Sequence, residues 1–112
     1  MKKGLLSLIA VSLTLASIPG RAESQLSAPV GKLYPMSSGV VDVTFVTSNT
    51  ACTNANNPPR YRLAVGVSGM TEEGMRNIMA VLMYAVSTNK DLVVSFDQTL
   101  STCNITRVLI SP

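Results

Sequence analysis

"TEEGMRNIMAVLMYAV", residues 71–86, is the stretch that decides which folds are open to this chain. It begins polar and acidic, and from Ile78 it continues as nine apolar residues in a row. Thr71 is a favourable N-cap, and acidic residues directly after it suit the positive end of a helix dipole. Asn89 can end a helix in the left-handed conformation. The pattern predicts one helix over residues 71–88.

The predicted helix is apolar on two sides. Its stronger face follows helical spacing and consists of Met75, Ile78, Met79, Leu82 and Val86. The later turns also carry Val81, Tyr84 and Ala85 on another side, which makes these three a candidate subunit contact. The run is shorter than the roughly 20 residues of a membrane-spanning helix. Two interpretations stay open: the helix lies in the core with its back covered by loops, or its second face contacts another subunit.

Strands are expected on both sides of this helix. Alternating apolar residues predict strands over 39–47, 60–67 and 91–97, and less regular patterns predict strands over 31–35 and 104–111. Residues 48–59 are rich in Asn, Thr and Pro, which is typical of a loop. Residues 23–30 are mostly polar, and we expect a loose N-terminal segment there.

The first 22 residues have the three parts of a secretory signal peptide. Lys2 and Lys3 precede an apolar stretch over residues 4–18, and Gly20 and Ala22 fit the small-residue positions before a cleavage site. We therefore expect cleavage after Ala22 and a periplasmic or secreted bacterial protein. The remaining 90 residues would form a single domain over 31–112 behind the loose segment.

Removing this leader changes the charge of the chain. The full sequence has nine Lys and Arg against six Asp and Glu, and three of the basic residues lie in the leader. The remainder carries six of each and has a net charge of about zero. A nucleic-acid-binding protein needs a positive surface, so we expect no nucleic-acid partner.

The two cysteines, Cys52 and Cys103, indicate one disulfide bond. A catalytic redox pair is expected closer together, and the chain contains no histidine that could complete a zinc site with the two cysteines. The bridge would close about 50 residues, which the chain-entropy model values at roughly 4 kcal/mol.

Residues for catalysis are sparse. Without histidine the chain lacks the usual general base and the commonest metal ligand, and its glycines form no phosphate-binding loop. Its carboxylates are scattered, although folding could still bring Asp42 and Asp97 together. We expect no enzyme activity, no metal and no cofactor. Arg60, Tyr61 and Arg62 form a candidate binding face for an anionic or sugar ligand, with a solvated outer strand face as the simpler alternative.

The order of leader, strands, helix and strands, with a disulfide from an early loop to just before the last strand, resembles the B subunits of pentameric bacterial toxins. The resemblance covers residues 31–112 and rests on Cys52, Cys103 and the helix over 71–88. It implies an α+β fold: a small, mainly antiparallel OB-like β barrel with one central helix. B subunits of this family bind host glycans, and none of their contact residues can be carried over to this sequence.

Three functions are compatible with these observations. The first is an exported, non-enzymatic binding or interaction protein. The second is a glycan-binding B subunit of a ring-shaped homo-oligomer, and the third is a small exported enzyme.

Overall fold

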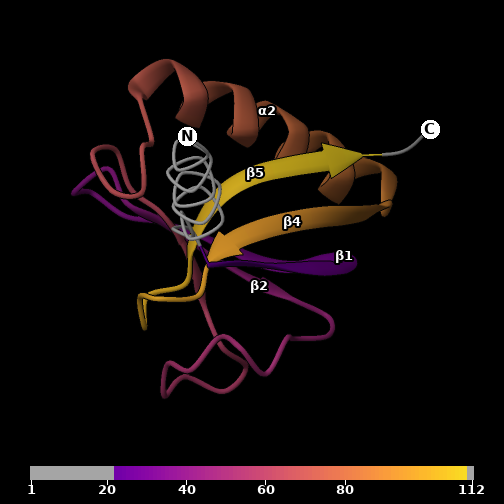
Figure 1. Cartoon of the computed structure of the whole chain (residues 1–112). Helices are drawn as coiled ribbons and strands as arrows, with labels where there is room; N and C mark the ends of the chain where they lie inside the picture. The colour runs from indigo at the N-terminus through magenta and orange to yellow at the C-terminus, as the bar shows by residue number, and fades with distance from the viewer. Residues whose placement is uncertain (1–21, 111–112) are drawn as a thin grey trace, which may run out of the picture.

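The structure, a computed structural model, describes residues 22–110 and has five strands and one helix in this part of the chain (Figure 1). The elements are β1 (Glu23–Pro35), β2 (Val41–Phe45), β3 (Tyr61–Leu63), α2 (Glu72–Thr88), β4 (Asp91–Asp97) and β5 (Asn104–Ile110). The predicted α+β class, with one helix set between strands, is confirmed. The expected signal peptide falls on residues 1–22, of which only Ala22 lies inside the described part.

The five strands close into a ring in the order β1-β2-β3-β5-β4. All neighbours are antiparallel except β3 and β5, which share the single parallel pair Arg62 and Asn104. Because β3 and β5 pair at only one position, the ring is OB-like but is not a regular barrel. Figure 1 shows α2 lying along β4 and β5, while the loop between β2 and β3 extends on the opposite side.

Strand β1 takes part in both halves of the ring. Residues 23–29 pair with β4, residues 30–35 pair with β2, and the register shifts between Val30 and Lys32. Gly31 lies at this bulge. A Cβ atom there would be 2.9 Å from the Thr44 hydroxyl oxygen, which already accepts a hydrogen bond from the Lys32 backbone at 3.0 Å. Glycine therefore allows β1 to bend tightly against β2.

The expectation of a loose segment over residues 23–30 is wrong. These residues form the first half of β1 and therefore belong to the folded unit that was expected over residues 31–112. Leu26 and Ala28 alternate into the core, with only 7% and 2% of their surface exposed. The polar residues Gln25 and Ser27 beside them are exposed, so the sequence contains little sign of a strand that pairs with β4 over seven positions.

The strands β2 and β3 are shorter than the alternation predicted. Val46 is 67% exposed just after β2, and Val65, expected on the buried face of β3, is 49% exposed. The chain leaves β3 after Leu63 because residues 64–70 form turns, with Gly66 at φ 90° and its amide bonded to the Met70 carbonyl. Turn formation overrides the apolar alternation here.

The ends of α2 agree with the sequence. The Thr71 hydroxyl accepts a hydrogen bond from the Gly74 amide at 3.0 Å, and Asn89 has φ 55°, the left-handed conformation expected of the C-cap. The helix packs against β1, β4 and β5. Its buried residues are Met75, Leu82 and Ala85.

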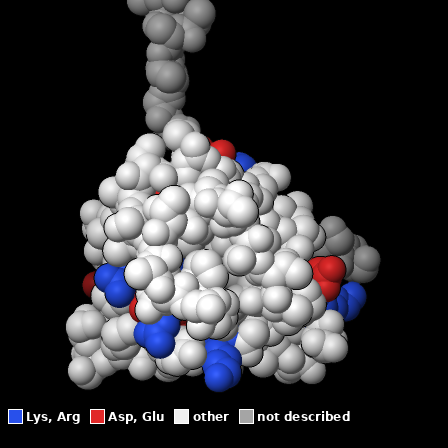
Figure 2. Space-filling model, turned by 90° about the horizontal axis from the view of Figure 1, so that it is seen from below, with Lys and Arg blue, Asp and Glu red and all other residues white. Residues whose placement is uncertain are grey.

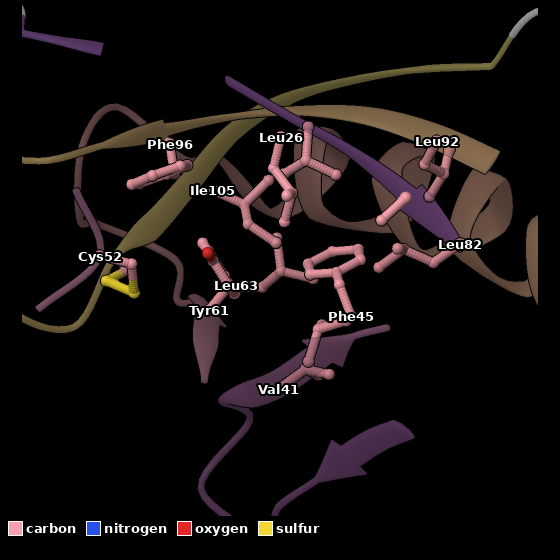
Figure 3. Packing of buried hydrophobic residues seen from close by; sticks show 14 of the residues in the cluster. Leu26, Val41, Phe45, Cys52, Tyr61, Leu63, Leu82, Leu92, Phe96 and Ile105 are labelled. Atoms are coloured by element: carbon pink, nitrogen blue, oxygen red, sulfur yellow. A yellow bond between two sulfur atoms is a disulfide. The ribbon is translucent and has the colours of Figure 1, made fainter. Parts of the chain in front are cut away.

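The core is built around three aromatic rings that come from different strands (Figure 3). Tyr61 packs edge-to-face against Phe45 at 5.2 Å on one side and against Phe96 at 5.0 Å on the other. Burial raises the pKa of the Tyr61 phenol, opposed by a hydrogen bond that its oxygen accepts from the Asn49 amide. This contact also fixes the start of the loop between β2 and β3.

We expect Gly31→Ala to lower the free energy of unfolding by about 1–3 kcal/mol, the usual cost of forcing extra volume into a packed site. The added Cβ must displace Thr44, which is buried. Chemical denaturation measures the change. Ser27→Ala is the control, because Ser27 is exposed on the same strand. Equal stability of the two variants would show that β1 does not need glycine at its bend.

Candidate functional site

A charged cluster lies on the outer side of the β2–β3 pair. The register places Asp42 opposite Arg62, while their neighbours Val43 and Tyr61 point into the core. Asp42 is only 3% exposed although it faces outward, because arginine side chains cover it. Both faces of β2 are therefore covered, whereas the alternation indicated a half-buried strand.

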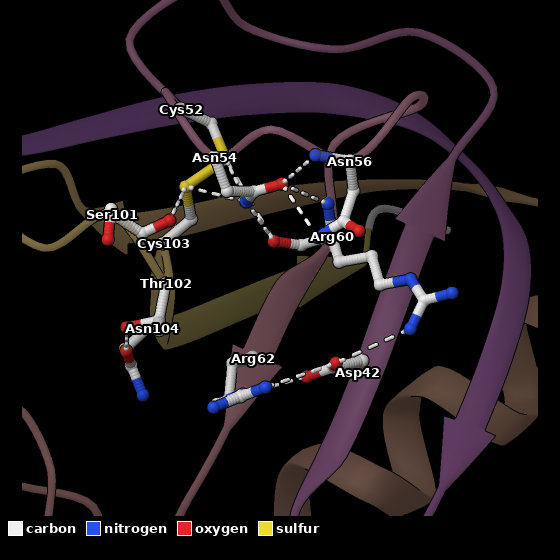
Figure 4. Close-up of polar contacts among 10 residues, drawn as sticks. All are labelled: Asp42, Cys52, Asn54, Asn56, Arg60, Arg62, Ser101, Thr102, Cys103 and Asn104. Carbon is white, nitrogen blue, oxygen red and sulfur yellow. Dashed lines mark hydrogen bonds and ion pairs between the residues drawn. A yellow bond between two sulfur atoms is a disulfide. The ribbon is translucent and has the colours of Figure 1, made fainter.

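Arg62 holds Asp42 with two hydrogen bonds. Its Nε donates to Oδ1 at 2.9 Å and a terminal nitrogen donates to Oδ2 at 3.3 Å (Figure 4). The hydrogen bond to Asp42 is the main cause of a raised pKa for the Arg62 guanidinium. This bidentate geometry is the strong form of an arginine–carboxylate pair, and it commits the positive charge of Arg62 to Asp42.

Arg60 is held much less tightly. Its nearest terminal nitrogen is 4.0 Å from Asp42 Oδ2, and its guanidinium carbon lies 4.2 Å from the centre of the Tyr34 ring. The Arg60 side chain is 36% exposed. Since Arg62 already balances the Asp42 charge, Arg60 supplies the spare positive charge of the cluster, stacked on an aromatic face.

A small polar recess lies beside this cluster. It has a volume of about 100 Å³ and is lined by Asp42, Asn54, Asn56, Arg60, Arg62, Ser101 and Thr102. One water molecule occupies about 30 Å³ of liquid, so the recess has the volume of about three water molecules. This is enough for one small group, such as a carboxylate or a hydroxymethyl group. The rest of any ligand would lie on the surface outside.

The disulfide joins the two walls of the recess. Cys52 and Cys103 are bonded, with their Cα atoms 5.6 Å apart, which confirms the pairing predicted from the sequence. Cys52 belongs to the loop that carries Asn54 and Asn56, and Cys103 directly follows Thr102. The bridge thus fixes the loop after β2 against the turn before β5.

The candidate binding face predicted from the sequence needs a correction. Arg60 and Arg62 line the recess, but Tyr61 is fully buried in the core and is not available to a ligand. Strand alternation explains the split, because Tyr61 points inward between two outward neighbours. The loop asparagines were not singled out from the sequence, since only folding and the disulfide bring them to the recess.

The candidate subunit contact is also corrected. Ala85 is 1% exposed and belongs to the core, and Val81 packs against the core, so only Tyr84 of the three faces solvent. Val86, expected on the buried face, is 48% exposed. The buried stripe is rotated toward Ala85, whose small side chain faces the strands at this level of the helix.

A larger apolar groove runs beside α2. Its volume is about 540 Å³, and its lining residues are Val65, Glu72, Met75, Arg76, Met79, Ala80 and Met83. The helix therefore keeps apolar surface toward solvent, as its sequence indicated, but this surface lies mainly along the groove, and only Tyr84 is exposed on the expected side. Met83 and Tyr84 are 54% and 51% exposed.

The acidic side chains considered as ligands or as a catalytic pair lie apart in the described part of the chain. Among residues 22–110, no three His, Cys, Asp or Glu side chains lie together in a way that could hold a metal ion. The recess contains Asp42 but not Asp97, which lies at the end of β4 and accepts a hydrogen bond from the Ser68 hydroxyl. The carboxylate pair considered from the sequence is thus not brought together in the recess.

Residues 23–112 carry six basic and six acidic side chains. The face shown in Figure 2 is mostly uncharged; several Lys and Arg groups lie toward its lower margin, and others lie beside acidic groups. A broad positive surface of the kind that nucleic acid requires is not visible on this face. Within the described part of the chain, no helix is both long and apolar enough to span a membrane.

Comparison with solved structures shows that the chain has the fold of bacterial toxin B subunits. The cholera toxin-like B subunit of Citrobacter freundii has a TM-score of 0.56 and 8% identity, with coverage of 90% of this chain and 96% of that one. Porcine heat-labile enterotoxin in complex with an inhibitor gives a TM-score of 0.61 at 9% identity, covering 89% and 95%.

The B subunit of heat-labile enterotoxin from E. coli, carrying a peptide with anti-HSV activity, gives a TM-score of 0.56 at 9% identity, covering 88% and 91%. No family model and no curated protein sequence matches the chain. The predicted resemblance is therefore confirmed at the level of the fold, and identities of 8–9% carry no site residue across.

We expect Arg62→Met to lower the free energy of unfolding by about 1–3 kcal/mol, because Asp42 stays largely buried after losing two charge-assisted hydrogen bonds. Chemical denaturation at neutral pH measures this. Arg76→Met removes an arginine from the exposed part of α2 and should stay within about 0.5 kcal/mol of wild type. A loss no larger than that of Arg76→Met would show that the Asp42–Arg62 pair does not stabilise the fold.

Proposed function

We propose that this protein is an exported, non-catalytic binding subunit that recognises a glycan through the recess beside Arg60. The observation that carries the proposal is the recess itself, located on a toxin B-subunit fold and lined by guanidinium, amide and hydroxyl groups. Such groups form the hydrogen bonds by which proteins orient polar ligands. The B subunits that the sequence resembles bind host glycans, and the fold agreement supports the same class of ligand.

The charges in the recess favour an acidic sugar over a neutral one. Asp42 is already paired with Arg62, while Arg60 has only one long contact to a carboxylate. A sugar carboxylate or sulfate placed beside Arg60 would complete this pairing without burying an unmatched charge. The size of the recess fits one such group, with the Tyr34–Arg60 stack at its side.

Export is part of the proposal. The Cys52–Cys103 disulfide is typical of proteins that fold in an oxidising compartment, which agrees with the signal peptide expected over residues 1–22. A periplasmic or extracellular location would also bring the recess into contact with glycans.

The exposed apolar surface of α2 supports a second proposal, that several copies of the chain assemble as a homo-oligomer. Met83 is 54% exposed, and it lines the apolar groove together with Val65, Met75 and Met79. Contiguous apolar surface of this kind commonly marks protein contacts. The B subunits that the sequence resembles form pentameric rings, which agrees with an assembly through this helix.

A glycan array probed with the oxidised protein tests the binding function. We expect the wild type to bind acidic glycans and Arg60→Gln to lose at least tenfold in affinity, because the spare guanidinium is gone. Arg107→Gln, which removes an exposed arginine of β5 outside the recess, is the matched control and should bind as the wild type does. Failure of the wild type to bind any glycan, or equal binding by Arg60→Gln, would refute the proposal. Mass spectrometry of recovered glycans distinguishes binding from hydrolysis by an enzyme.

Solution mass by light scattering tests the oligomer. We expect the wild type to exceed the mass of one chain, and Met83→Glu to shift it toward the monomer, because a charge would then lie on the apolar contact. Asn77→Glu adds the same charge to another exposed position of α2 and should leave the mass unchanged. A monomeric wild type would end this second proposal without affecting the first.

A further inference from the structure

Asn54 occupies a central position in the wall of the recess. Its side-chain oxygen accepts hydrogen bonds from the Arg60 amide at 3.2 Å and from the Asn56 amide and side chain at 3.2 and 3.1 Å. Its side-chain nitrogen donates to the Arg60 carbonyl at 2.7 Å (Figure 4). The one side chain thus holds both backbone polar groups of Arg60, the residue that precedes β3.

The same nitrogen of Asn54 also contacts the disulfide. It lies 3.3 Å from Cys52 Sγ and 3.5 Å from Cys103 Sγ, so it faces both sulfur atoms. On the far side, the Cys103 carbonyl accepts a hydrogen bond from the Arg62 amide at 3.2 Å. The backbone on either side of the recess is therefore tied to the bridge, through Asn54 at Arg60 and directly at Arg62.

The loop that carries Asn54 has little else to fix its shape. Residues 46–60 contain no strand or helix, and most of their side chains are exposed or half-buried. Asn49 holds the beginning of the loop through Tyr61, while the later part depends on Asn54 and Cys52. Polar contacts of one amide side chain can select a single loop conformation, since each alternative leaves its partners unpaired.

We propose that Asn54 is the positioning residue that holds Arg60 in the recess, with the Cys52–Cys103 bridge as its anchor, so that ligand binding requires the oxidised disulfide. The proposal rests on the glycan function above and adds its regulation: the site forms in an oxidising compartment and is lost when the bridge is reduced. The strand pairings that close the ring do not include residues of this loop, so loss of the site does not require loss of the ring.

Titration with galacturonate and, for comparison, with galactose, followed by NMR, tests the proposal. The two sugars differ mainly in the carboxylate of galacturonate. We expect Asn54→Ala to weaken galacturonate binding at least fivefold while the disulfide and the thermal unfolding transition persist. Thr53→Ala changes the exposed neighbour and serves as the control. Treatment of the wild type with dithiothreitol should also weaken galacturonate binding at least fivefold.

The double variant Asn54→Ala/Arg60→Gln separates positioning from a general structural role. If Asn54 acts through Arg60, adding Asn54→Ala to Arg60→Gln weakens galacturonate binding no further. Additive losses would overturn the proposal, and so would galacturonate binding by Asn54→Ala that equals the wild type.

A ligand-free measurement keeps the inference testable if the wild type binds neither sugar, an outcome that counts against the glycan function. The Arg60 and Asn56 amides should exchange with deuterium at least tenfold faster in Asn54→Ala, and in the reduced wild type, than in the oxidised wild type. Unchanged exchange in these samples would show that Asn54 and the bridge do not hold the recess, whatever its ligand.

Discussion

The bend of β1 at Gly31 is the constraint on which the ring depends. One strand pairs with β4 over its first half and with β2 over its second half, so the two halves of the sheet meet only because β1 changes direction. A side chain at the bend would collide with Thr44 of the neighbouring strand. The parallel β3–β5 contact that completes the ring is a single residue pair and could not hold it closed alone.

The candidate site follows from this closure. Because β3 and β5 are parallel neighbours, the loop that leads into β3 and the turn that leads into β5 come to lie side by side, joined by the Cys52–Cys103 bridge. The recess is formed from these two connections and from the outer faces of β2 and β3. In many proteins a rigid sheet positions loops that carry the functional groups. These groups can change while the fold is kept.

Local chemistry made several elements predictable. The caps at Thr71 and Asn89 specify both ends of α2, and alternation specifies β4, since these signals depend on neighbouring residues alone. The strand over residues 23–30 escaped prediction because only Leu26 and Ala28 mark its buried face. The recess could not be predicted for a different reason: Asp42, Asn54 and Thr102 are far apart in the sequence, and no spacing rule connects them.

The sequence by itself determined the class of fold, the position of the helix and the pairing of the two cysteines, because periodicity, capping and cysteine count each act locally or by elimination. Tertiary structure alone decided which apolar residues of α2 face solvent, since helix rotation depends on how closely Ala85 approaches the strands. It also decided that Tyr61 is buried while Arg60 and Arg62 line a recess. Strand alternation indicates that neighbours separate, but only closure of the ring decides which side becomes the core.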